Sequence, residues 1–159
     1  MRLLVGPITA VARLVGETDH VLSLISPGAD APVLAQCQTV LRFNDISEDH
    51  EGLVAPSTAT IEAILALADT PALLIHCFAG VSRSTAAAYV LACAKRAPGE
   101  EEVLADQLRA LCPEATPNPL MVSLADTILR RDGAMSRAIA GIGRGADCFE
   151  GSVVDWRLA

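Results

Sequence analysis

The chain has 159 residues, of which 52% are hydrophobic and 19% are charged, and its formal net charge is −7. This length and composition predict one globular domain spanning residues 1–159 rather than a disordered chain. The acidic excess argues against nucleic acid and anionic membrane surfaces as partners, because both would be repelled.

In chain order, short apolar runs alternate with helical patterns over the first half. A first strand at 3–5 is followed by a helix from Pro7 to Gly16, and further strands are expected at 20–25 and 39–43. Residues 29–36 are ambiguous, and a polar loop covers residues 44–52. Pro56-Ser57-Thr58 then opens a helix whose apolar stripe runs from Ile61 to Ala68, and the fourth strand is 72–76.

The second half is expected to be helical, and no element is predicted in the tail, residues 143–159. Strands alternating with helices are typical of a mostly parallel sheet covered on both faces. We therefore predict an α/β fold with a four- to five-stranded sheet. The helices expected here are 85–96, 100–111, 120–131 and about 135–142.

Two features bear on the compartment. The five cysteines are scattered, with no Cys-x-x-Cys pair, which favours a reducing cytoplasm over a disulfide framework or a zinc site. The apolar N-terminal stretch is broken by Gly6-Pro7 and preceded by Arg2 alone, which favours a strand and a turn over a signal peptide. No run reaches the ~18 apolar residues of a membrane span. We expect a cytoplasmic protein without metal or cofactor.

The most informative stretch is His76-Cys77-Phe78-Ala79-Gly80-Val81-Ser82-Arg83-Ser84. It joins a predicted strand to a predicted helix, and a loop that enters a helix points its backbone N–H groups inward as a nest for an anion. Gly80 permits the turn and the approach of a ligand to the backbone. Arg83 offers a planar, two-pronged donor to a phosphate-like oxyanion. Cys77 at the mouth of such a nest is favoured as the nucleophilic thiolate.

This stretch resembles the signature loop of the cysteine-dependent protein tyrosine phosphatases, in which His-Cys is followed by five residues, Arg, and Ser or Thr. Compact bacterial and dual-specificity-type members are the most similar. The resemblance implies a tyrosine phosphatase-like fold with Cys77 as the nucleophile. It also implies that Ser84 donates to the sulfur and that His76 orients the loop, although a helix N-terminal serine and a core histidine remain alternatives. The residues expected around the phosphate are Phe78, Ala79, Gly80, Val81, Ser82 and Arg83.

Expulsion of an alkoxide or phenoxide needs a general acid. Asp45 directly follows the third predicted strand, and its position, 32 residues before Cys77, matches that of the acid in dual-specificity-type members. Asp49, further along the same loop, is the alternative, and both could be solvated loop residues. We favour Asp45, because a residue close to its strand is held more rigidly. Asn118, before Pro119, lies in a Pro-Asn element similar to one in compact bacterial phosphatase-like proteins. We interpret Asn118 mainly as a helix cap and as a possible auxiliary residue of the site.

These residues predict a metal-independent phosphomonoester hydrolase that acts through a phosphocysteine. Its substrate would be a phosphorylated protein or a small aryl phosphate ester, since inositol polyphosphates would need more cations than Arg83 and a single lysine in the chain provide. One alternative is a catalytically silent module that binds phosphate esters. A second is a rhodanese-type sulfurtransferase, against which Arg83-Ser84 argues. No glutamine-bearing loop like that of the large tyrosine-specific enzymes is recognisable, so the group that positions water is unassigned.

Overall fold

The computed structural model describes residues 1–158, and within them five strands form one sheet in the order β3-β2-β4-β1-β5. The first four strands run parallel, whereas β5 is antiparallel to β1. The predicted α/β architecture with a mostly parallel sheet is therefore confirmed. The strands are β1 (Arg2–Pro7), β2 (His20–Ile25), β3 (Cys37–Arg42), β4 (Ala72–Cys77) and β5 (Val154–Arg157).

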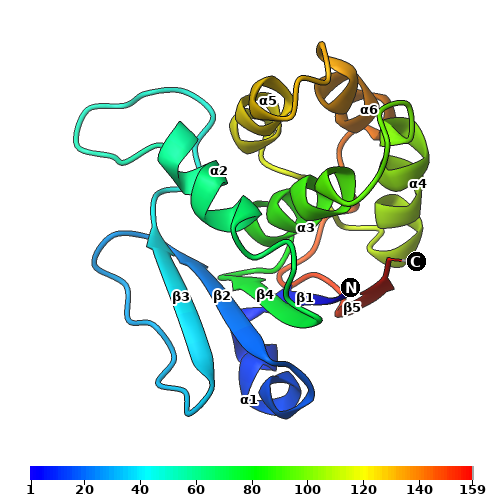
Figure 1. The fold of residues 1–159 in the computed structure, drawn as a ribbon. Helices are drawn as coiled ribbons and strands as arrows, with labels where there is room; N and C mark the ends of the chain where they lie inside the picture. Colours follow the sequence, from blue (N-terminus) through cyan, green and yellow to red (C-terminus); the bar gives the residue numbers. More distant parts are fainter. Residues whose placement is uncertain (159) are drawn as a thin grey trace.

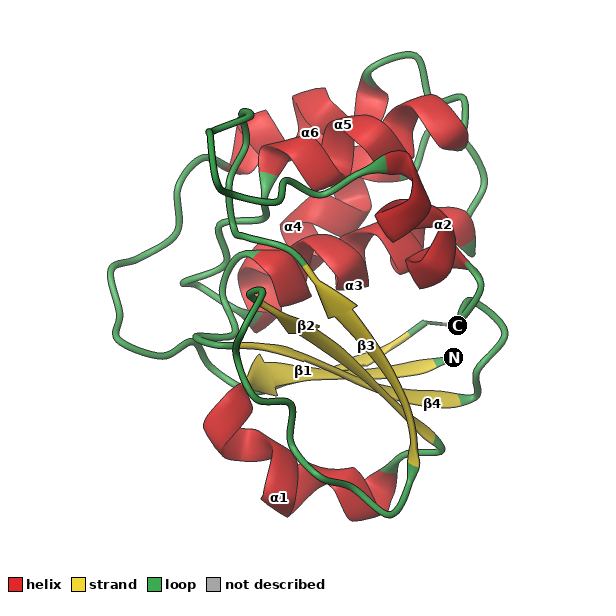
Figure 2. Cartoon of the chain, turned by 90° about the vertical axis from the view of Figure 1, so that its left-hand side faces the viewer, coloured by secondary structure: helices red, strands yellow, loops and turns green. Residues whose placement is uncertain are grey.

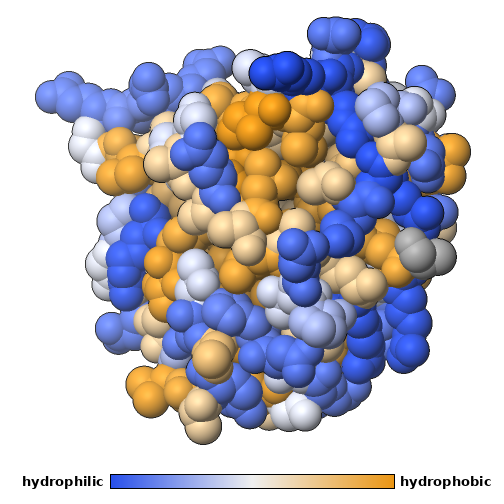
Figure 3. Space-filling view, in the orientation of Figure 1, coloured by the Kyte–Doolittle hydropathy of each residue, from blue (hydrophilic) through white to orange (hydrophobic). Residues whose placement is uncertain are grey.

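Helices cover both faces of this sheet, as predicted (Figures 1 and 2). The short helix α1 (Val11–Leu14) packs on one face, against Leu4, Val21 and Leu74. The larger helical layer lies on the opposite face (Figure 2). In the view of Figure 1, apolar side chains gather over the middle of that layer and polar ones surround them (Figure 3). The layer consists of α2 (Thr58–Leu65), α3 (Arg83–Ala94), α4 (Glu101–Leu111), α5 (Pro119–Ile128) and α6 (Ala134–Ile142).

Helix α3 is the central helix of this layer and contacts β1, β4, α2, α4 and α5. Every residue from Arg83 to Cys93 is buried, which explains why its sequence is rich in alanine and apolar on all sides rather than amphipathic. The helix begins two residues before the predicted start at Thr85, so Arg83 and Ser84 belong to its first turn. The start of α3 is therefore held inside the core.

Two predictions about the chain ends need correction. The helix expected from Pro7 to Gly16 is a short α-helix flanked by 3-10 turns at Ile8–Ala10 and Val15–Glu17. Gly16 is a poor helix former, consistent with the tightened last turn. The tail was expected to lack regular structure, but it contains β5. This strand was missed because it is only four residues long and buries just two of them.

The edge strand β5 is fastened to β1 by more than the backbone ladder. Arg2 donates two hydrogen bonds of 2.9 Å to the Asp155 carboxylate, and Trp156 buries its ring while its indole N–H reaches Gln107 at 3.3 Å. The tail is thus part of the sheet.

Among residues 1–158, no helix combines the length and the apolar character that crossing a bilayer requires.

Candidate active site

The sulfur of Cys77 lies at the end of β4, where two hydrogen-bonding groups converge on it. The side chain is 3% exposed, and the backbone N–H of Gly80 donates to Sγ at 3.3 Å. The Ser84 hydroxyl, in the first turn of α3, lies 3.2 Å from the same sulfur. Hydrogen-bond donors aimed at a sulfur stabilise its anionic form.

The loop after Cys77 turns its carbonyl groups outward. Because the peptide bonds are trans, each outward carbonyl points the following N–H group in the opposite direction, into the loop. The N–H groups of Ala79, Gly80, Ser82 and Arg83 therefore face inward, as the nest prediction requires. Four of these carbonyls accept a backbone hydrogen bond: Phe78 O from Ile8 N at 3.1 Å, Ala79 O from Gly151 N at 2.8 Å, Val81 O from Thr116 N at 2.8 Å, and Ser82 O from Ala86 N at 2.9 Å.

Gly80 permits the turn, as predicted, and it also lies close to the end of β1. Its φ of +77° lies in the left-handed region, which favours glycine. A Cβ at this position would lie 2.5 Å from the Pro7 nitrogen and 2.6 Å from the Gly6 carbonyl carbon. A side chain at Gly80 would therefore collide with the end of β1.

Arg83 brings a buried positive charge to the loop. Its side chain is 6% exposed, and Nη1 donates to the Phe43 carbonyl at 2.9 Å and to the Ser26 hydroxyl at 3.3 Å. Among residues 1–158, no carboxylate forms an ion pair with it, and its buried Nε has no hydrogen-bond partner. A buried guanidinium with an unused donor is costly without an anion, so this site is suited to an oxyanion.

A small, mainly apolar pocket of about 120 Å³ opens beside the Arg83 guanidinium. Phe78 forms part of its wall and is 67% exposed, as expected for a residue at the rim of a site. The pocket is lined by Ile8, Ile25, Ser26, Ala29, Asp30, Phe78 and Arg83.

The structure brings Asp45 to the signature loop. Its Oδ1 accepts a hydrogen bond from the Ser82 hydroxyl at 2.7 Å and another from the Asn118 side-chain amide at 2.8 Å. The amide of Asn118 also donates to the Ile46 carbonyl at 3.1 Å, while its oxygen accepts from Met121 N at 3.0 Å and caps α5. Asn118 is therefore both the helix cap that we predicted and a direct partner of Asp45.

Asp49 is not brought to the signature loop by any such contact. It is exposed on the loop that leads from β3 to α2, and its carboxylate makes no hydrogen bond or ion pair with residues 1–158. The two candidate acids therefore differ in tertiary contacts, although they share one loop.

His76 lies on the opposite face of β4 from Cys77. It is fully buried, and its Nε2 is 2.6 Å from the Ser23 hydroxyl, whereas its Nδ1 has no partner among residues 1–158. Burial lowers the pKa of His76 below its ordinary value, and the positive charge of Arg83 acts in the same direction. The ring is therefore neutral at pH 7.

Comparison with known proteins finds no matching family model and no similar curated protein. Solved structures do match. DUSP15 aligns with a TM-score of 0.58 at 18% identity, over 88% of this chain and 89% of its own. Human DUSP28 aligns with a TM-score of 0.57 at 19% identity, over 85% of this chain and 94% of its own. The Yvh1 phosphatase domain from Chaetomium thermophilum aligns with a TM-score of 0.56 at 20% identity, over 84% of this chain and 93% of its own.

The chain has a dual-specificity phosphatase-like fold. Sequence reasoning identified the loop from Cys77 to Arg83 as the candidate site but missed the residues that hold this loop from outside. These are the backbone N–H groups of Ile8, Thr116 and Gly151. Gly151 offered a sequence signal as an isolated glycine, and Thr116 lies beside Asn118 in the Pro-Asn element. A Cβ there would lie 2.7 Å from Cγ1 of Val81.

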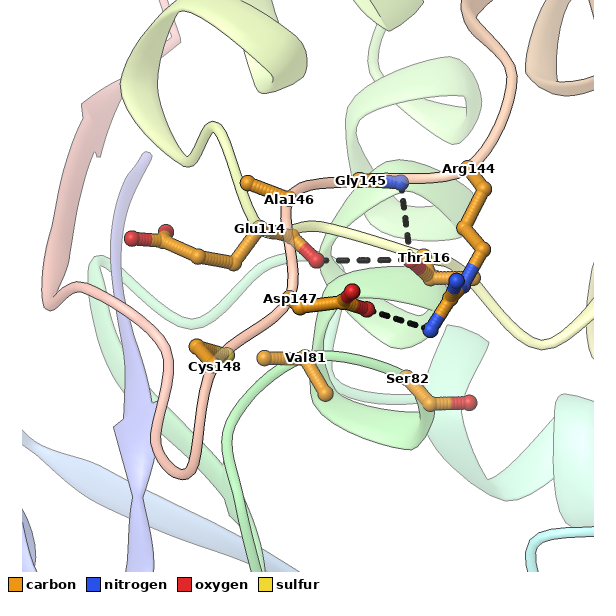
Figure 4. A pocket seen from close by; sticks show the side chains of 9 residues that line it. All are labelled: Val81, Ser82, Glu114, Thr116, Arg144, Gly145, Ala146, Asp147 and Cys148. Carbon is orange, nitrogen blue, oxygen red and sulfur yellow. Dashed lines mark hydrogen bonds and ion pairs between the residues drawn. The ribbon is translucent and has the colours of Figure 1, made fainter.

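The chain with this dual-specificity phosphatase-like fold has a second pocket, of about 250 Å³, beside Val81 and Ser82 of the loop after Cys77 (Figure 4). Its one lining cation, Arg144, is paired with Asp147 (Figure 4). This arrangement does not favour a second anion, so Arg83 remains the cation of the site. The lining residues are Val81, Ser82, Glu114, Thr116, Arg144, Gly145, Ala146, Asp147 and Cys148.

Proposed function

We propose that this protein is a metal-independent phosphomonoester hydrolase that works through a phosphocysteine intermediate. The observation that carries the proposal is the set of inward N–H groups in the loop after Cys77, together with the buried Arg83 guanidinium at the end of that loop, which forms no ion pair with residues 1–158. Fixed donors of this kind stabilise the charge that spreads over the equatorial oxygens of a transferring phosphoryl group.

In the first step, the Cys77 thiolate attacks phosphorus. An S–P bond forms, the bond from phosphorus to the leaving oxygen breaks, and protonated Asp45 gives its proton to that oxygen. In the second step, the Asp45 carboxylate takes a proton from water, and the water oxygen attacks phosphorus. The S–P bond breaks, Ser84 hydrogen-bonds the departing sulfur, and inorganic phosphate leaves.

The contacts of Asp45 support its assignment over Asp49. A general acid acts from a fixed position within hydrogen-bond reach of the leaving oxygen. Ser82 and Asn118 tie Asp45 to the rim of the signature loop, whereas Asp49, exposed like Asp45, makes no hydrogen bond or ion pair with residues 1–158.

The surroundings of the loop support a phosphorylated protein or a small aryl phosphate as the substrate. The pocket beside Arg83 is walled by Ile8, Ile25 and Phe78, which suit an apolar leaving group, and its one carboxylate, Asp30, disfavours further phosphates. The net charge of −7 acts in the same direction. Phosphotyrosine should therefore be favoured modestly over phosphoserine, and both over phosphoinositides.

The first prediction tests the proposed reaction itself. The purified protein should hydrolyse p-nitrophenyl phosphate in the presence of EDTA, and Cys77→Ser should abolish turnover because serine is not ionised at neutral pH. Cys37→Ser, at an exposed thiol at the start of β3, is the matched control and should retain the activity. Phosphotyrosine peptide, phosphoserine peptide and phosphoinositide are then compared by kcat/KM.

Each alternative gives a different result in these assays. A requirement for added metal, or activity that survives in Cys77→Ser, would overturn the mechanism. Stoichiometric binding of phosphopeptide without product release would indicate a silent binding module. Transfer of sulfur from thiosulfate to cyanide would indicate a sulfurtransferase.

A further inference from the structure

Three polar side chains form a chain of hydrogen bonds across the sheet, behind the signature loop. Gln38 of β3 donates to Ser23 of β2 at 2.8 Å, and Ser23 contacts His76 of β4 at 2.6 Å. Ser23 and His76 are direct partners in the parallel ladder between β2 and β4. None of the three takes part in the proposed reaction, apart from the supporting role implied for His76.

The direction of the first hydrogen bond is fixed by a backbone group. The side-chain nitrogen of Gln38 is 3.2 Å from the Pro32 carbonyl as well as 2.8 Å from the Ser23 hydroxyl. A carbonyl oxygen can only accept, so the Gln38 atom between these two partners must be the NH₂ group. Its two hydrogens go to Pro32 and Ser23, and the Ser23 oxygen is therefore an acceptor.

The second hydrogen bond follows from the first. Ser23 is fully buried, and its hydroxyl has two partners among residues 1–158, Gln38 and His76. Because Gln38 donates to it, His76 Nε2 is the acceptor left for the hydroxyl hydrogen. A nitrogen that accepts carries no hydrogen, so the neutral ring of His76 carries its hydrogen on Nδ1.

This tautomer bears on the nucleophile. With Nε2 engaged by Ser23, Nδ1 carries the hydrogen, although it has no partner at hydrogen-bond geometry among residues 1–158. The Cys77 backbone favours a hydrogen on this ring. Because Nδ1 is the ring nitrogen covalently nearer the main chain, we infer that the N–H end of the ring dipole lies toward the backbone that leads into the loop after Cys77. A positive dipole end there favours a negatively charged sulfur, whereas the lone pair of the other tautomer would oppose it. Arg83 is the charged neighbour that acts on this ring, and the effect of Cys77 on it comes from the backbone.

We propose that Gln38 and Ser23 are positioning residues, which hold His76 in the Nδ1–H tautomer and thereby support the thiolate of Cys77. The link to catalysis rests on the proposed function. The tautomer itself does not, and it can be measured independently of turnover.

The decisive variant is Gln38→Glu. It keeps the shape of the side chain but replaces the NH₂ donor with a carboxylate, so the Ser23 hydroxyl turns to donate to the new carboxylate. Ser23 then accepts from His76, which reverses the tautomer or leaves the ring protonated. Gln36→Glu is the matched control: it adds the same charge two residues earlier, at a side chain that makes no hydrogen bond with residues 1–158.

The first readout is the ¹⁵N chemical shifts of the histidine rings, which is practical because the chain has three histidines, at positions 20, 50 and 76. Wild type and Gln36→Glu should show a protonated Nδ1 and a bare Nε2 at His76. Gln38→Glu should show the reverse or two protonated nitrogens. A bare Nδ1 in the wild type would overturn the proposal, and so would an unchanged tautomer in Gln38→Glu.

The second readout is alkylation of Cys77 by iodoacetamide, followed by mass spectrometry of its peptide as pH is varied. At neutral pH the rate should fall about tenfold in Gln38→Glu, because a smaller share of Cys77 is then thiolate, and stay unchanged in Gln36→Glu. If Gln38→Glu does not fold, Ser23→Ala serves instead and should give mixed tautomers and slower alkylation. Equal rates in all variants would refute the positioning role. A protein with the expected tautomer and alkylation that does not hydrolyse phosphate esters would refute only the proposed function.

Discussion

At the residue scale, Asp45 and Asp49 offer the sharpest comparison. Both are carboxylates on one loop, but only Asp45 is hydrogen-bonded to the signature loop and to α5. We expect Asp45→Ala to lower turnover by about 10²–10⁴-fold, the range of general acid catalysis, with the largest loss for substrates with poor leaving groups. The measurement is kcat for a series of aryl phosphates, together with the pH profile of kcat/KM, which should lose one limb.

Asp49→Ala is the control for that experiment and should leave both the leaving-group dependence and the pH profile unchanged. If Asp49→Ala gives the pattern expected of Asp45→Ala, the assignment of the acid is wrong. If neither change alters the leaving-group dependence, the acid lies elsewhere.

At the element scale, Asn118 gives the start of α5 two separable roles. Asn118→Ala should lower the free energy of unfolding by about 1 kcal/mol through loss of the cap. It should also lower turnover, because the amide no longer holds Asp45, and a displacement of about 1 Å can cost about a hundredfold. Urea unfolding and kcat measure the two effects separately.

Asn118→Ser distinguishes these roles. Serine caps helices about as well as asparagine, but it has no amide group to donate to Asp45 or Ile46. We therefore expect Asn118→Ser to unfold at nearly the urea concentration of the wild type while its turnover falls as in Asn118→Ala. Wild-type turnover in Asn118→Ser would show that the contact with Asp45 is structural only.

At the scale of the whole molecule, the buried His76 makes folding sensitive to acid. Its pKa is lowered, chiefly by burial, from an ordinary value of 6.5, so below that pH the unfolded chain binds a proton that the folded protein does not. The contribution of the neutral His76 ring to the free energy of unfolding is therefore fully present above about pH 6.5. It is lost as the pH falls toward the pKa that His76 has in the folded protein. Urea unfolding at pH 7 and pH 5 should show this decrease, and His76→Gln should reduce it.

Two further groups act in a different pH window. Backbone hydrogen bonds lower the pKa of Glu114 below 4.5, and the Arg2 guanidinium lowers that of Asp155 below 3.8, so their contributions are lost only at more acidic pH. His20→Gln is the matched control. His20 is also a histidine on a strand with a hydroxyl partner, since its Nε2 lies 2.8 Å from Thr39 Oγ1, but it is only partly buried. A decrease that persists in His76→Gln and disappears in His20→Gln would contradict the prediction.

The sequence by itself determined the parallel sheet and the signature loop. Four apolar runs of strand length, each separated by helical or polar segments, specify the parallel strands through local pattern. Cys77, Gly80 and Arg83 lie within seven consecutive residues, so a strand, a loop and a helix start bring them together without help from distant parts of the chain. Local geometry alone was enough to predict an anion nest beside a thiol.

Only the tertiary structure decided how that loop is held and what surrounds it. The outward carbonyls are bonded by Ile8, Thr116 and Gly151, and Asp45 is bonded by Asn118, 73 positions away. The polar chain behind His76 is likewise assembled from separate strands. Such contacts depend on register and packing between elements far apart in sequence, and loop acids such as Asp45 and Asp49 are locally alike. Their physical difference arises only when the folded chain supplies hydrogen-bond partners to one of them.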